Sequence, residues 1–199
     1  MKKIAPVWKW LLLVLLAALA IIAAFHFDDA VRAWVASHHN RSARHFMQLV
    51  SRFGDWPEHV VAGLLIIGIA AARRSKRWMR IGLTMLLACA LAGIAARGVK
   101  IASGRARPSV RQEVHWHGPG LSSRYNSFPS GHTAATVGFF GVLPFVRRKL
   151  GLALLPIPLL IAISRIYVSA HYLSDVVCGA LLGILCAWVA VQWLRPGES

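Results

Sequence analysis

The sequence predicts an all-α integral membrane protein, a six-transmembrane-helix bundle with further helices at the membrane interface, and we expect residues 1–199 to form a single domain. Hydrophobic residues make up 57% of the chain and charged residues only 15%, whereas soluble domains contain about 45–50% apolar and about 25% charged residues. The mean hydropathy is correspondingly high, at +0.56. The charges cluster between apolar runs, which is typical of helices that cross a bilayer.

The chain is strongly basic, with a formal net charge of +16. In a soluble protein such a charge would indicate a nucleic-acid partner, but here the basic residues lie at the ends of apolar segments. We therefore expect contact with anionic lipid headgroups and no nucleic-acid partner. The three cysteines, Cys89, Cys178 and Cys186, all fall inside apolar runs, and we expect them to pack as small hydrophobic side chains.

Six apolar runs define the expected membrane helices. They cover residues 7–25, 60–72, 81–96, 133–146, 150–168 and 173–194. The first run is also compatible with a signal peptide, because Ala18-Leu19-Ala20 resembles a cleavage site, but its length favours an uncleaved helix. Several runs are shorter than the about 20 residues that a perpendicular span needs, so polar residues beside them must lie at membrane depth or extend to the interface.

Polar segments separate these runs. Residues 26–58 carry apolar side chains at a spacing that favours amphipathic helices lying at the interface. Residues 97–129 form a loop that contains glycine and proline, and tight basic turns occupy residues 73–80 and 147–149.

The basic residues also bear on orientation. An even number of spans places both termini on one side. The total number of basic residues is balanced between the two membrane faces. The short turns and the first helix, which Lys2 and Lys3 precede, nevertheless dominate the positive-inside effect. We expect the termini in the cytoplasm, and the 26–58, 97–129 and 165–175 segments on the outer face.

The most informative stretch runs from Arg165 to Asp175. His171 and Asp175 are four residues apart, so on a helix they share one face, and the carboxylate can fix the imidazole tautomer. The other ring nitrogen then serves as a base or nucleophile, and Arg165 can hold an anion beside it. An interfacial salt bridge with a capping aspartate is the structural alternative.

Two further clusters belong to the same face. Lys100 and Arg107 are two helical turns apart and can reach one anion, although a basic helix end at the interface is an ordinary feature. Ser130 is a good N-cap for the fourth run, Gly131 allows a ligand close to the backbone, and His132 follows in the first turn. An ordinary helix cap is the alternative. Taken together, cations, backbone N–H groups, two histidines and a carboxylate indicate phosphoryl transfer without a metal ion.

Three motifs carry a resemblance to a known family. They are Lys100-x6-Arg107-Pro108, then Pro129-Ser130-Gly131-His132, then Ser164-Arg165-x5-His171-x3-Asp175. This pattern resembles that of the type 2 phosphatidic acid phosphatase (PAP2) superfamily of membrane lipid phosphatases, with every signature position present. The resemblance implies a PAP2/haloperoxidase-like core and a phosphohistidine formed on His171 and supported by Asp175. It also implies that His132 is the general acid and that no metal or other cofactor is needed. Phosphate would be held by Lys100, Arg107, Ser130, Gly131 and Arg165.

Several alternatives remain open in the sequence. A phosphotransferase would use the same residues as a hydrolase, and a lipid or phosphate transporter on this fold would not need His132, His171 and Asp175 together. Candidate substrates are undecaprenyl diphosphate, phosphatidylglycerophosphate, phosphatidic acid and a lipid A phosphate, in a bacterial inner membrane. His115 and His117 resemble a metal-binding pair, although a headgroup contact explains them better and a plain solvated loop explains them best. Arg105, Arg111 and Arg124 would add positive potential near the site, and Ser127 matches no nucleophile motif.

Overall fold

The computed structural model describes residues 7–38, 40–110 and 115–196, and within these ranges most of the chain is helical. Lys2, Lys3 and Arg111, which enter the sequence-based predictions, lie outside the described residues. The helices are α1 (Val7–Ser37), α2 (Arg41–Arg52), α3 (Trp56–Ala72), α4 (Lys76–Ser103), α5 (Gly131–Val146), α6 (Arg148–Leu154), α7 (Pro156–Tyr167) and α8 (Leu173–Leu194), with a short 3₁₀ turn at Ser123–Tyr125.

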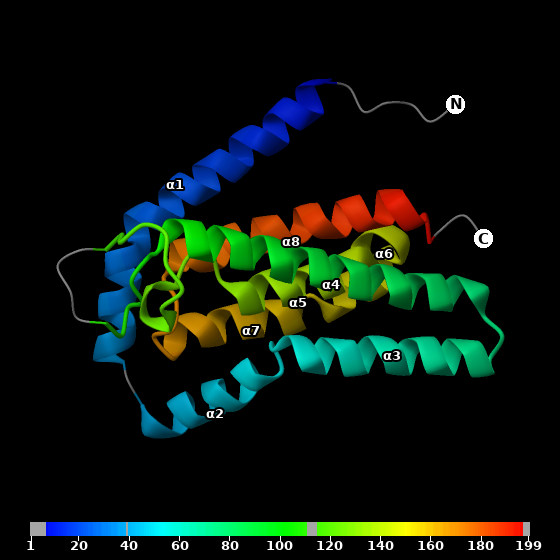
Figure 1. Cartoon of the computed structure of the whole chain (residues 1–199), viewed down its shortest axis with the longest axis horizontal. Helices are drawn as coiled ribbons and strands as arrows, with labels where there is room; N and C mark the ends of the chain where they lie inside the picture. Colours follow the sequence, from blue (N-terminus) through cyan, green and yellow to red (C-terminus); the bar gives the residue numbers. More distant parts are fainter. Residues whose placement is uncertain (1–6, 39, 111–114, 197–199) are drawn as a thin grey trace.

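The centre of the bundle is formed by α4, α5 and α8, and the contacts of α5 with α8 and with α4 are the two most extensive between the described helices (Figure 1). Glycine makes two of these approaches possible, because a Cβ on Gly138 would lie 2.8 Å from the Ala88 carbonyl oxygen and one on Gly183 would lie 2.7 Å from that of Ala134. Small residues at helix contacts are typical of membrane bundles, where close backbone packing replaces the hydrophobic effect. The buried side chains around them include Ile81, Met85, Ala88, Phe139, Val142 and Ala187.

The prediction of an all-α membrane bundle is confirmed. The helices α1, α4 and α8 and the consecutive pair α6–α7 are long and apolar enough to cross a membrane. The pair α2–α3, bent by 52°, makes a fifth crossing if it is counted as one broken span. The sixth apolar element is α5, which has 16 residues and is shorter than an ordinary span.

The first helix is longer than its apolar run predicts. The run ends at Phe25, but α1 continues without interruption to Ser37 and takes up the first part of the segment expected to lie at the interface. Only its second half is anchored by buried side chains, which are Ala24, Asp28 and Val35. The chain therefore carries a carboxylate, Asp28, into the interior on α1, and Figure 1 shows the first half of this helix diverging from the bundle.

The predicted interfacial helix corresponds to α2. Asn40 caps it, because its side-chain oxygen accepts hydrogen bonds from the backbone N–H groups of Ser42 and Ala43. The turn between α2 and α3 contains Gly54, where a Cβ would lie 2.5 Å from Ile161 Cγ2. Glycine therefore lets this turn pack tightly against α7.

The two ends of the bundle carry different connections. The α3–α4 turn, α6 and the end of α8 lie toward the right of Figure 1. The described parts of the loop after α4, residues 104–110 and 115–130, and the α7–α8 turn lie at the opposite end. This arrangement places the three motifs at one end of the molecule and the basic turns at the other.

Candidate active site

Lys100 is delivered by the last turn of α4. The helix ends at Gly104, which adopts a left-handed conformation with φ of 58° and is the favoured residue for such a cap. The Lys100 ammonium group is almost completely buried and donates hydrogen bonds to the carbonyl oxygens of Asn126 and Ser127, at 2.7 and 3.2 Å. These contacts fix the lysine beside the end of the 104–130 loop.

Arg107 lies in the first part of that loop. Its backbone N–H donates to the Arg124 carbonyl oxygen at 3.0 Å, and its side-chain Nε donates to the Ser123 carbonyl oxygen at 3.0 Å. The loop therefore folds back on itself, and within the described residues the two Nη groups of Arg107 make no hydrogen bond.

The Pro129–His132 motif forms the start of α5. The Ser130 hydroxyl accepts hydrogen bonds from the N–H and the hydroxyl of Thr133, so this serine is the N-cap that the sequence predicts. A Cβ on Gly131 would lie 3.4 Å from Lys100 Cε, so the lysine stem passes over the first turn of the helix. The first N–H groups of a helix have no partner within its backbone, and of these the Thr133 N–H is bonded by the Ser130 side chain.

His171 lies in the turn before α8 and is 3% exposed. Its Nδ1 is 3.5 Å from Asp175 Oδ2, at the outer limit of a hydrogen bond, and this nitrogen has no closer partner among the described residues. Burial, together with the charges of Lys100 and Arg165, lowers the pKa of His171 to about 4, although Asp175 opposes this. The imidazole is therefore neutral at physiological pH, and with Nδ1 turned to Asp175 the opposite nitrogen, Nε2, carries the free lone pair.

Asp175 is the centre of a buried hydrogen-bond network. Oδ2 accepts hydrogen bonds from the Ser127 hydroxyl at 2.5 Å and from the Tyr172 backbone N–H at 2.9 Å. Oδ1 accepts from Arg105 Nη1 at 2.6 Å. Ser127, for which the sequence suggested no role, therefore helps to fix the carboxylate that faces His171.

The sequence suggested that Arg105 only adds positive potential near the site. In the structure it is instead a buried member of this hydrogen-bond network. Its Nη2 donates to Asp28 Oδ2 at 2.7 Å, and its Nη1 also donates to the Ser174 hydroxyl at 2.7 Å. The guanidinium group is further enclosed by aromatic rings, with centroids 4.2 Å away for Tyr172, 5.1 Å for Trp116 and 5.2 Å for Phe25. The sequence signal for this network was Asp28, since an acidic residue within a membrane helix is a functional hypothesis by default.

The α2–α3 turn supplies contacts to the remaining motif residues. Arg165 Nη1 donates a short hydrogen bond to the Ser51 hydroxyl. His132 Nε2 lies 2.7 Å from Asp55 Oδ1. Neither Ser51 nor Asp55 belongs to a motif, and no local pattern in the sequence pointed to them.

The motif residues converge at one end of the bundle. The charges of Arg165, Lys100, Arg107 and His171 all act on His132, and those of Lys100 and Arg165 act on His171. Every site residue that the sequence predicted is thus found in one cluster. It comprises Lys100, Arg107, Ser130, Gly131, His132, Arg165, His171 and Asp175.

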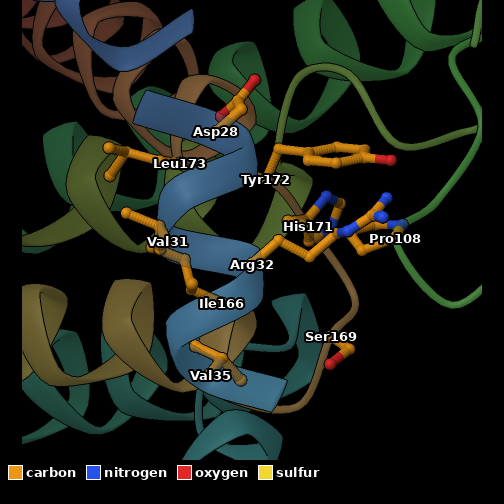
Figure 2. Close-up of a pocket in the computed structure, with 10 residues that line it drawn as sticks. All are labelled: Asp28, Val31, Arg32, Val35, Pro108, Ile166, Ser169, His171, Tyr172 and Leu173. Carbon is orange, nitrogen blue, oxygen red and sulfur yellow. The ribbon is translucent and has the colours of Figure 1, made fainter. Parts of the chain in front are cut away.

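A small cavity of about 10 Å³ adjoins His171 on the side of α1. Figure 2 shows Arg32 of α1 extending across it toward Pro108 and His171, with Tyr172 above. A cavity of this size holds about one water molecule. The second half of α1 is thus a wall of the site, which accounts for the burial of this half and not of the first.

A larger groove runs along the outside of the bundle between α3 and α4. It has a volume of about 580 Å³ and is lined almost entirely by apolar side chains, with Trp56 and Arg97 also among its lining residues. Trp56 follows Asp55 directly, and Arg97 lies one turn before Lys100. The groove therefore leads along apolar surface to the neighbourhood of the cationic cluster.

The histidines of the loop do not form a metal site with other described residues. The ring of His117 packs on Tyr125 with centroids 4.0 Å apart, and His115 contributes its backbone carbonyl to the Ala106 N–H. Among the described residues there is no group of three or more histidine, cysteine, aspartate or glutamate side chains with the geometry to hold a metal ion. Arg124 lies on the exposed side of the loop.

The helical bundle and the cationic cluster at one of its ends define an integral membrane protein that concentrates positive charge at that end. The chain belongs to the PAP2 superfamily, whose family profile matches residues 81–197. It is 29% identical over 205 residues to a lipid A 1-phosphatase of Rhizobium johnstonii, a match that covers 92% of this chain and 78% of the relative. It is 33% identical over 93 residues to the undecaprenyl-diphosphatase BcrC of Bacillus subtilis, covering 45% of this chain and 47% of the relative.

Structural comparison gives the same family. The fold matches the crystal structure of a transmembrane PAP2-type phosphatidylglycerolphosphate phosphatase from Bacillus subtilis with a TM-score of 0.68 and 25% sequence identity. The match covers 97% of this chain and 96% of that structure. The resemblance inferred from the three motifs is therefore confirmed at the level of the family.

Proposed function

We propose that this protein is a membrane lipid phosphatase that hydrolyses a phosphate monoester or diphosphate through a phosphohistidine intermediate. The observation that carries the proposal is the position of His171. Its Nδ1 faces Asp175 and its imidazole is neutral, while Lys100 and Arg165 lie within electrostatic range. A nucleophile, its orienting carboxylate and the cations for the transferred group therefore come together in one site.

In the first half-reaction, the lone pair of His171 Nε2 attacks the phosphorus atom, and the bond between phosphorus and the leaving oxygen breaks. Lys100, Arg107 and Arg165 neutralise the oxygens of the transferring group, with the first N–H groups of α5 after Ser130 and Gly131 as further donors. Asp175 stabilises the positive charge that develops on the His171 ring. A proton on His132 passes to the leaving oxygen, so that the product leaves as a neutral hydroxyl or as a protonated phosphate.

In the second half-reaction, a water molecule attacks the phosphohistidine. His132, now neutral, takes one proton from the water, the bond between phosphorus and Nε2 breaks, and inorganic phosphate is released. Both histidines then return to their starting protonation states, and the net reaction is hydrolysis. Transfer to another acceptor hydroxyl in place of water would make the protein a phosphotransferase and uses the same groups.

The chemistry needs no metal ion on this account, because three cationic side chains supply the charge that a metal would otherwise provide. Substrate delivery is explained by the groove between α3 and α4, which can take a lipid chain while its phosphate reaches the cluster. The relatives named above act on lipid A, undecaprenyl diphosphate and phosphatidylglycerolphosphate, and phosphatidic acid shares the same chemistry. We favour undecaprenyl diphosphate, with the site on the periplasmic face of a bacterial inner membrane, since that carrier is released on the outer leaflet.

The decisive experiment is phosphate release by the purified protein from a panel of these four lipids. We expect His171→Ala to abolish turnover and Asp175→Asn to reduce it by up to about 10⁴-fold, as seen when the aspartate of a serine-protease triad is replaced. Brief incubation of the wild type with a lipid carrying ³²P in its phosphate, followed by denaturation in alkali, should trap label that is labile to acid. Activity of His171→Ala close to that of the wild type would overturn the mechanism.

A further inference from the structure

The α2–α3 turn brings a second carboxylate to the site. Asp55 Oδ1 lies 2.7 Å from His132 Nε2, and the Asp55 side chain is 49% exposed. Gly54 makes this approach possible, because a Cβ there would lie 3.3 Å from His132 Cδ2 and 2.5 Å from Ile161 Cγ2. The neighbouring Ser51 accepts a hydrogen bond from Arg165. The turn is thus held against both the phosphate-binding arginine and the histidine of the Pro129–His132 motif.

The cationic cluster creates an electrostatic difficulty for His132. This residue must carry a proton when it acts on the leaving group, but burial opposes that proton most, and the positive charges of Arg165, His171, Lys100 and Arg107 add to the opposition. Asp175 does not offset them, since its oxygens are occupied by Arg105, Ser127 and Tyr172 and it faces His171. Among the described residues, Asp55 is the carboxylate in contact with His132.

We propose that Asp55 is a positioning residue for proton transfer, which holds the His132 ring through Nε2 and stabilises its protonated form. This inference rests on the phosphatase function proposed above. With Nε2 directed at Asp55, Nδ1 is left as the nitrogen that gives the proton to the leaving oxygen in the first half-reaction. The same nitrogen takes a proton from the attacking water in the second. The site then contains two aspartate–histidine pairs, one for the nucleophile and one for the acid and base.

The surroundings of Asp55 agree with this role. Burial and the neighbouring Glu58 raise the pKa of the Asp55 carboxyl, whereas Arg165, His59 and Arg52 lower it. A carboxylate of higher basicity is the better hydrogen-bond partner for an imidazolium ion. Arg165 therefore has two electrostatic effects on this pair, because its positive charge disfavours the protonated form of His132 and favours the ionised form of Asp55.

The test depends on the leaving group. An alkyl lipid phosphate needs its leaving oxygen protonated, whereas p-nitrophenyl phosphate releases a stable phenolate that does not. With Asp55→Asn we expect kcat/KM for the lipid phosphate to fall by about 100-fold or more, the scale of general acid catalysis. The p-nitrophenyl substrate should still give a burst of one p-nitrophenolate per active site at a rate within about tenfold of the wild type, followed by slow turnover, because the second half-reaction still lacks its base.

Glu58→Gln is the matched control, because it removes the same charge three residues away, at an exposed position. Its effect on both substrates should be far smaller than that of Asp55→Asn, because Glu58 acts on the Asp55 carboxyl only through its charge and Asp55 makes the contact with His132. Asp55→Glu should restore part of the lipid activity. In a double-mutant cycle, Asp55→Asn should add little to the defect of His132→Gln, since both changes act on one proton transfer.

Several outcomes would overturn the inference. One is that Asp55→Asn lowers the burst rate with p-nitrophenyl phosphate as much as it lowers kcat/KM for the lipid phosphate. Another is that the defects of Asp55→Asn and His132→Gln multiply in the double variant. The third is that Asp55→Asn keeps wild-type activity on the lipid phosphate. If these occur while His171→Ala is inactive, the role of Asp55 fails but the phosphatase function stands. If His171→Ala is itself active, the proposed function fails first.

Discussion

Arg105 Nη1 lies 2.6 Å from Asp175 Oδ1, in a pair whose side chains are 7% and 0% exposed. The same guanidinium group also bonds Asp28, so one arginine joins the loop after α4 to carboxylates on α8 and α1. Asp175 faces His171, and its position relative to the imidazole therefore depends on a helix that contributes no motif residue. The orientation of the histidine and the packing of α1 are coupled through this one contact.

Arg105→Gln should accordingly reduce both activity and stability. Removal of one partner from a buried ion pair destabilises a protein by about 3–5 kcal/mol, because the other charge stays buried without compensation. We expect a clear fall in the thermal unfolding temperature in detergent and a fall in phosphate release of about tenfold or more, the scale seen when a supporting partner is lost. Arg124→Gln, at an exposed position of the same loop, should change neither.

A second variant separates charge from packing. Adding Asp28→Asn to Arg105→Gln removes one of the two uncompensated carboxylates and should recover part of the unfolding temperature. A double variant less stable than Arg105→Gln alone would show that the network acts through packing and not through charge.

The pKa of His171, lowered to about 4 mainly by burial, predicts a pH dependence of stability. The folded protein resists protonation of this ring, whereas the unfolded chain takes up the proton near pH 6.5, the ordinary value. The contribution of neutral His171 is therefore fully present above about pH 6.5 and is lost as the pH falls toward 4. The groups that face this ring are Lys100, Arg165 and Asp175.

Thermal unfolding of wild type and His171→Gln, measured between pH 4 and pH 8, checks this expectation. The wild type should lose more stability than the variant between pH 6.5 and pH 4, and the two should run in parallel above pH 6.5. Parallel curves throughout would mean that His171 has an ordinary pKa in the folded protein.

Activity should survive an excess of chelator and should be inhibited by orthovanadate, which adopts the five-coordinate shape of the transferring phosphoryl group. The reason is that Lys100, Arg107 and Arg165 provide the positive charge at the site. Phosphate release with and without chelator is the measurement. Loss of activity in chelator and its recovery with Mg²⁺ or Zn²⁺ would contradict this expectation and direct attention to His115 and His117.

The sequence predicted the fold and the motif residues for a physical reason. Runs of apolar residues predict membrane helices directly. Local patterns of spacing or helix capping in the sequence marked the motif residues Lys100, Ser130, His132 and His171. The contacts of Asp55, Ser51 and Arg105 have no such pattern, because they join segments that are distant in the chain and depend on how α1 and α2 pack. The sequence predicted too early an end for the first helix for a related reason. Asp28 is stabilised within α1 by the distant Arg105 and not by its own neighbours in the chain.

The orientation of the site can be tested by cysteine labelling. In a protein with Cys89, Cys178 and Cys186 replaced, Ser122→Cys reports on the 104–130 loop and Ser75→Cys on the α3–α4 turn. Ser122 is exposed and makes no side-chain capping bond, so the substitution is close to neutral. Gly118 in the same loop is less suitable because its φ of 74° disfavours any side chain.

We expect the 104–130 loop to be accessible from outside the cell and the α3–α4 turn to be accessible from the cytoplasm. A membrane-impermeant thiol reagent should label Ser122→Cys in intact cells whose outer membrane has been permeabilised, and Ser75→Cys only after the inner membrane is opened. The reverse pattern would place the site in the cytoplasm and would remove the reason for preferring a carrier lipid of the outer leaflet.

The groove between α3 and α4 makes the lipid assignment testable at the level of single residues. Gly93 lines this groove, and a Cβ at that position meets no atom within 4 Å. Gly93→Leu should therefore fill the groove without disturbing the bundle and should favour the helix by the intrinsic propensity of leucine. Gly68→Leu is the matched control, because Gly68 on α3 is equally open and does not line the groove.

The measurement is kcat/KM for a long-chain lipid phosphate and for a short-chain, water-soluble analogue with the same headgroup. The wild type should prefer the long chain, since each buried methylene contributes about 0.8 kcal/mol of binding. Gly93→Leu should lower the value for the long chain by about tenfold or more, because a loss of two buried methylenes already has that effect. The short-chain value should be unchanged, and so should both values for Gly68→Leu. If the wild type handles both substrates equally, the chain contributes no binding and the substrate is not a lipid held in this groove.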